Sequence, residues 1–89
     1  MTYSVYLDPR VARVLKRLEP PLPERIKLGL RDLQESPETK GERLNPSDYW
    51  KMRIGDYIAI FQINKKAKSI VVLFVGHRSN VYDDFRRML

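Results

Sequence analysis

The spacing of hydrophobic positions changes along the chain, and each change predicts a different element. Residues 2–7 are rich in β-branched and aromatic side chains, which is typical of a short strand. Apolar residues then recur at helical spacing in residues 9–19 and again in residues 23–35. Prolines separate these two segments, so we expect an αα-hairpin. Residues 79–89 show helical spacing again and predict a short C-terminal helix.

The middle of the chain predicts a loop and then three strands. Residues 36–48 are polar and contain proline and glycine, so we interpret them as a loop. Residues 49–54 alternate strictly between apolar and polar side chains, whereas residues 57–63 and 69–75 are nearly continuous apolar runs. The Gly-Asp pair at 55–56 is a two-residue hairpin signal, with glycine first as a type II′ turn prefers.

This order of elements predicts an α+β fold. We expect an N-terminal strand, an αα-hairpin, a three-stranded antiparallel meander and a short C-terminal helix, with the helices packed on one face of the sheet. At 89 residues the chain has room for one such domain, spanning residues 1–89.

The two-residue turn also fixes which side chains share a face of the hairpin. One face is apolar and is expected to pack under the helices; it pairs Trp50 with Phe61, Met52 with Ala59, and Ile54 with Tyr57. The opposite face places Arg53 beside Ile58 and Lys51 beside Ile60, which predicts a cationic, partly apolar platform. Alternation alone would also make an exposed strand face polar, so each cation taken singly is weak evidence.

The amino-acid composition limits the kinds of binding site and partner that the chain can have. The chain has no cysteine and one histidine, which excludes disulfides and thiolate metal sites, and we expect no cofactor. No signal peptide and no apolar run near the length of a membrane span is present, so we expect a cytoplasmic protein without a membrane partner. The net charge of +6 favours a polyanion or an acidic protein as partner.

Five polar residues form the candidate catalytic set. His77 and Arg78 follow the last predicted strand, and Tyr82 lies about one helical turn beyond them. With Lys51 and Arg53 they are expected at one end of the sheet. Such a set suits cleavage of RNA by its own 2′-hydroxyl, which needs a base, an acid, and cations for the charge of the transition state.

Several stretches resemble the RelE/ParE superfamily of toxins from bacterial and archaeal toxin–antitoxin pairs. They are "YWKMRIGDYIAIFQI", "VLFVGHRSNVY", the opening "MTYSVYLDPRVARVLKRL" and the "ESP" after the second helix. The resemblance implies a small α+β toxin fold, metal-independent cleavage of mRNA in the ribosomal A site, and a RelB-like antitoxin as partner. It matches Lys51 and Arg53 to basic positions before the hairpin, His77 or Arg78 to one after the last strand, and Tyr82 to a tyrosine near the C-terminus.

The chain departs from the superfamily pattern at Ile58. Members commonly read "GDYR", with the arginine next to the scissile phosphate, where this chain reads "GDYI". Loss of one such contact weakens a transition state by about 2–4 kcal/mol. Two alternatives therefore stand beside the ribonuclease: a ParE-like toxin that inhibits DNA gyrase through protein contacts, and a degenerate toxin that retains antitoxin or RNA binding.

Overall fold

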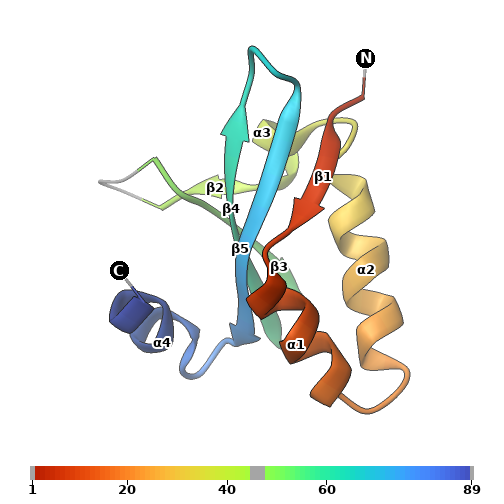
Figure 1. The fold of residues 1–89 in the computed structure, drawn as a ribbon, viewed down its shortest axis with the longest axis vertical. Coiled ribbons are helices and arrows are strands. Elements are labelled where there is room, and N and C mark those ends of the chain that lie inside the picture. Colours follow the sequence, from red (N-terminus) through yellow and green to blue (C-terminus); the bar gives the residue numbers. More distant parts are fainter. Residues whose placement is uncertain (1, 45–47, 89) are drawn as a thin grey trace.

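A five-stranded sheet with the strand order β1-β5-β4-β3-β2 forms the centre of the protein (Figure 1). The computed structural model describes residues 2–44 and 48–88. β1 runs parallel to β5, whereas the other neighbouring strands are antiparallel. In chain order the elements are β1 (Ser4–Leu7), α1 (Pro9–Arg17), α2 (Leu22–Asp32), α3 (Pro37–Lys40), β2 (Glu42–Arg43), β3 (Trp50–Ile54), β4 (Tyr57–Asn64), β5 (Ser69–His77) and α4 (Val81–Met88).

Helices α1 and α2 lie on one face of the sheet and form the main core with it (Figure 1). α1 begins after Asp8, whose carboxylate accepts a hydrogen bond from the N–H of Arg10 at 2.9 Å, the contact of a helix N-cap. α2 approaches β3 closely at Gly29, where a Cβ atom would lie 2.8 Å from Cδ1 of Ile54. The buried residues of this core are Val11, Leu15, Ile26, Leu30, Leu33, Met52, Ala59, Phe61, Ile70, Val72 and Val75.

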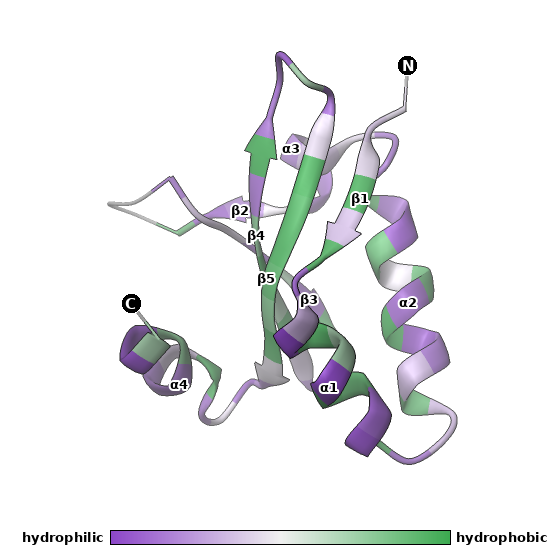
Figure 2. Ribbon diagram, in the orientation of Figure 1, coloured by the Kyte–Doolittle hydropathy of each residue, from purple (hydrophilic) through white to green (hydrophobic). Residues whose placement is uncertain are grey.

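The β3–β4 hairpin has the register that the two-residue turn predicts. Trp50 pairs with Phe61, Ile54 pairs with Tyr57, and the pairs between them follow in order. Gly55 has a φ angle of 60°, a backbone conformation that glycine adopts without the strain other residues meet. The inner strands β4 and β5 are apolar along much of their length (Figure 2).

The C-terminal helix α4 packs on the opposite face of the sheet. Its buried side chains, Val81 and Phe85, form a second core with Ile58 and Ile60 of β4. The prediction that the helices share one face is therefore right for α1 and α2 and wrong for α4. The helix comes close to β5 at Gly76, where a Cβ atom would lie 3.0 Å from Cγ2 of Val81.

A break in the β4–β5 register supplies further side chains to this second core. Ile60 pairs with Phe74 and Phe61 pairs with Val72, so Leu73 is an extra residue in β5. Leu73 and Phe74 both pack against the cluster under α4, whereas Val72 belongs to the main core. The bulge thus directs two consecutive residues to the face that α4 covers.

The segment predicted as a loop contains short elements. α3 and β2 lie within residues 36–48, and β2 extends the sheet by pairing with β3. Gly41 joins them and packs tightly, because a Cβ atom there would lie 2.6 Å from Cζ of Phe61. Within the part of the chain that the structure describes, no helix has the length and apolar character needed to cross a membrane.

Candidate active site

Lys51 and Tyr82 meet on the face of the sheet that α4 covers in part. The Lys51 ammonium lies 5.6 Å from the centroid of the Tyr82 ring, within the range of a cation–π contact. Both side chains are half-buried. They line a hollow of about 230 Å³ together with Arg53 and Ile58. β3 therefore supplies Lys51 and Arg53 to this hollow, and α4 supplies the aromatic ring.

The β3–β4 turn brings Arg53 and Arg78 to the same end of the sheet. The Arg53 Nε donates a hydrogen bond to the Gly55 carbonyl at 2.7 Å, and its guanidinium lies 3.9 Å from the Asp56 carboxylate. The Arg78 Nε lies 3.6 Å from the same carboxylate, and the Arg78 N–H donates to the Asp56 carbonyl at 2.8 Å. Because these side chains are more than half exposed, solvent screens both ion pairs.

His77 lies at that end of the sheet but on the other face. It pairs in register with Tyr57, and the two rings meet edge to face with centroids 5.5 Å apart. Its Nδ1 is 2.9 Å from Oγ of Ser79 and accepts a hydrogen bond from the Ser79 N–H at 3.2 Å. His77 lines a separate hollow of about 400 Å³ with Arg25 of α2. Arg53, His77 and Arg78 therefore lie near the β3–β4 turn, whereas Lys51 lies further along β3, opposite Ile60. The sheet separates His77 from Lys51 and Tyr82.

Two charged residues that line this hollow were not among the site residues predicted from the sequence. Lys40 and Glu42 line it, and Glu42 stands directly opposite Lys51 in the β2–β3 pairing. Glu42 is the one carboxylate among the described residues that line this hollow. Opposite charges facing each other across strands are a recognisable signal, but the polar segment 36–48 gave no indication that it held a strand.

Ile58 has the predicted register but a different environment. It pairs with Arg53, as the hairpin requires, yet it is only 8% exposed. Val81 and Phe85 of α4 pack over it. We expected a cationic, partly apolar platform on this face and a core on the other face only; this is wrong at Ile58, which packs in a second core under α4.

Solved structures of RelE toxins share this architecture. The RelE–RelB complex of Pyrococcus horikoshii is 28% identical, with a TM-score of 0.71, over 88% of this chain and 97% of that one. A free E. coli RelE with two arginines replaced by alanine is 25% identical, with a TM-score of 0.76, over 100% of both chains. The RelBE2 complex of Mycobacterium tuberculosis has a TM-score of 0.79 at 24% identity, over 89% of this chain and 94% of that one.

The fold and these likenesses define a RelE-like toxin of a type II toxin–antitoxin system. The model of the family described as "ParE toxin of type II toxin-antitoxin system, parDE" matches residues 5–82, so the chain belongs to the ParE toxin family within the RelE/ParE superfamily. A search of curated proteins finds no similar sequence.

Proposed function

We propose that this toxin is a ribosome-dependent endoribonuclease that cleaves mRNA in the A site. The observation that carries this proposal is the convergence of Lys51, Arg53 and Tyr82 in one hollow, with the Lys51 ammonium 5.6 Å from the Tyr82 ring centroid. Cations and an aromatic ring are the groups that bind a phosphate and an unstacked base of single-stranded RNA.

The proposed reaction uses the 2′-hydroxyl of the RNA as nucleophile. Its oxygen attacks the adjacent phosphorus, the bond from phosphorus to the 5′-oxygen breaks, and the products are a 2′,3′-cyclic phosphate and a 5′-hydroxyl. Glu42 accepts the proton of the 2′-hydroxyl, and Lys51 donates a proton to the leaving 5′-oxygen. Arg53 stabilises the charge on the phosphorane, and Tyr82 stacks on a base. Glu42 takes the role of base because His77 lies on the other face of the sheet.

The test is primer extension on programmed ribosomes with matched variants. Lys51→Ala/Arg53→Ala is expected to lower the cleavage rate by about 100-fold or more, as loss of one preorganised donor alone costs about 10²–10³. Glu42→Gln is expected to lower it by about 10²–10⁴, the usual contribution of a general base. His77→Ala serves as the control on the opposite face and is expected to cleave like wild type.

A second candidate function is inhibition of DNA gyrase through protein contacts. The presence of Ile58, and not arginine, in the hollow and the match to the ParE family favour it. Under this proposal the wild type produces no codon-spaced cuts and inhibits supercoiling by purified gyrase. The Lys51→Ala/Arg53→Ala variant then inhibits gyrase as well as wild type does.

We also infer a RelB-like antitoxin as the physiological partner, supported by the solved relatives that are described as RelE–RelB complexes. Co-expression with the product of the adjacent gene, followed by size-exclusion chromatography, tests this. A stable complex that suppresses growth arrest supports the proposal, and independent elution of the two proteins contradicts it.

A further inference from the structure

Strand β4 extends beyond its partner β3. The β3–β4 pairing ends at Trp50 and Phe61, whereas β4 continues to Asn64 alongside β5. Among residues 2–44 and 48–88, no strand pairs with this last part of β4 on the side of β3. The β2–β3 hairpin diverges from β4 there, so the sheet forks (Figure 1).

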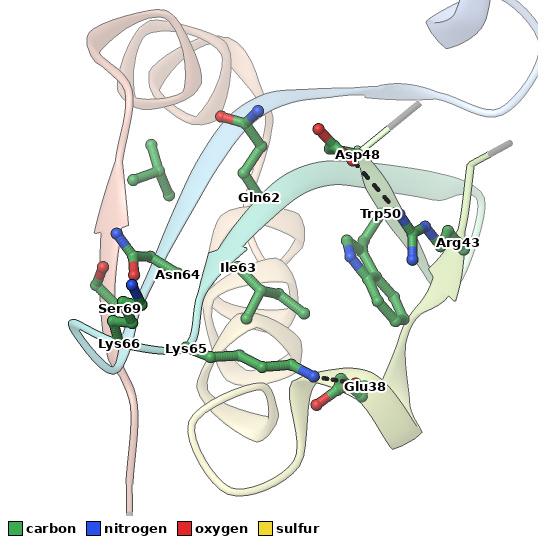
Figure 3. Close-up of a pocket in the computed structure, with 11 residues that line it drawn as sticks. Glu38, Arg43, Asp48, Trp50, Gln62, Ile63, Asn64, Lys65, Lys66 and Ser69 are labelled. Carbon is green, nitrogen blue, oxygen red and sulfur yellow. Dashed lines mark hydrogen bonds and ion pairs between the residues drawn. The ribbon is translucent and has the colours of Figure 1, made fainter. Parts of the chain in front are cut away.

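A hollow of about 600 Å³ occupies this fork. Ile63 lies in its middle, with Trp50 on one side and the Lys65 side chain extending below (Figure 3). Trp50 and Ile63 are half-buried and also pack against the main core. They therefore form an apolar surface inside the hollow that is held in place by the core. Gln62, Asn64 and Ser69 line the other side of β4.

The backbone of Ile63 faces the same hollow. In a two-residue hairpin the residues flanking the turn form a hydrogen-bonded pair, here Ile54 and Tyr57, and every second residue thereafter directs its N–H and C=O to the partner strand. On β4 this series runs from Tyr57 through Ala59 and Phe61 to Ile63. The N–H and C=O of Ile63 therefore point to the side of β4 that β3 no longer pairs with beyond Phe61.

Two ion pairs form the rim of the hollow on the side of Trp50. Lys65 lies 3.2 Å from Glu38, and Arg43 lies 3.4 Å from Asp48 (Figure 3). The Arg43 guanidinium also lies 6.0 Å from the centroid of the Trp50 ring. These charged side chains are about half exposed or more, so their pairing is weak and a partner can exchange into it.

We infer that the fork binds an extended segment of a protein partner as an added strand with the pattern acidic–polar–apolar–polar–acidic. The central apolar side chain packs on Trp50 and Ile63, and the segment's backbone pairs with Ile63. The first and last residues of the segment have their side chains on the same face as the central one. Their carboxylates pair with Arg43 and Lys65. A nucleic acid fits less well, because the exposed strand edge matches the donors and acceptors of a peptide backbone.

This inference is independent of RNA cleavage and has its own probe. Trp50 is the sole tryptophan of the chain, so its fluorescence reports binding directly. We expect a saturable change on titration with the blocked peptide Glu-Ser-Leu-Ser-Glu. The same blocked peptide with an N-methylated leucine is expected to leave the fluorescence unchanged, since it lacks the central N–H that would pair with Ile63.

Charge variants provide the matched comparison. Lys65→Glu is expected to weaken binding of the Glu-Ser-Leu-Ser-Glu peptide at least tenfold, whereas Lys27→Glu, at an exposed position of α2 outside the fork, changes it less than twofold. A shift of the Ile63 amide resonance upon binding supports the added strand. Equal binding of both peptides, no response at millimolar peptide, or competition by a six-nucleotide oligouridylate overturns the inference.

Discussion

Replacing Ile58 by arginine would restore the superfamily pattern, yet the structure predicts that it destabilises this protein. Ile58 is 8% exposed and packs under α4 against Ile60, Val81 and Phe85. Ile58→Arg removes this apolar contact and places a charge under the helix. Full removal of a buried isoleucine side chain costs about 2–5 kcal/mol, and an arginine that extends to solvent recovers part of this, so we expect about 2–3 kcal/mol.

Thermal unfolding checks this magnitude. For a chain of this size about 4–8 °C of Tm corresponds to 1 kcal/mol, so the melting temperature of Ile58→Arg is expected to fall by about 8–24 °C. Ile58→Val keeps the apolar contact and is the control, with an expected loss of about 0.5–1.5 kcal/mol. Amide hydrogen exchange locates the effect, because the amides of α4 should lose protection before those of β4 and β5.

One result would refute the reasoning about Ile58. If Ile58→Arg melts within a few degrees of wild type and the α4 amides stay protected, the packing of α4 on the sheet does not depend on Ile58. If that variant also cleaves mRNA where wild type does not, position 58 belongs to the cationic platform predicted from the sequence. The ribosome assay on the same preparation therefore distinguishes two roles of position 58: support of α4, or a catalytic contact that the isoleucine has removed.

Two further predictions concern the helices. Gly76→Ala is expected to lower stability by about 1–3 kcal/mol, because its Cβ would lie 3.0 Å from Cγ2 of Val81, and denaturant unfolding measures this. Hydrogen bonds from Arg10 lower the pKa of the Asp8 carboxyl from its ordinary value of 3.8. A lowered pKa adds stability above the ordinary value and loses it as pH falls, so the Tm advantage of wild type over Asp8→Asn should be constant above about pH 5 and shrink toward pH 2. An advantage independent of pH would contradict this.

The hairpin was predictable because local rules fix it completely. A two-residue turn with glycine first leaves one register, and Gly55 and the pairs from Ile54–Tyr57 to Trp50–Phe61 follow from it. The short elements α3 and β2 were not predictable, because four and two residues are too few to show a period. They exist through tertiary contacts such as the pairing of β2 with β3.

The position of α4 was missed although the sequence held a signal. Residues 57–63 form a nearly continuous apolar run, and such a run indicates a strand that is buried on both faces. The prediction of a cationic platform at Ile58 and Ile60, with a core on the other face only, did not take this into account. The face of His77 depends on the β4–β5 register, which the longer turn and the bulge at Leu73 leave undetermined in the sequence.

The second core connects the stability of the fold to the candidate site. Tyr82 is carried by α4, and α4 is held on the sheet by its neighbour Val81 and by Phe85. The contact of Tyr82 with Lys51 therefore exists only while α4 stays packed on Ile58 and Ile60. A variant that weakens this packing, such as Gly76→Ala, should lower the melting temperature and the toxic activity together, whereas Lys51→Ala should lower the activity alone.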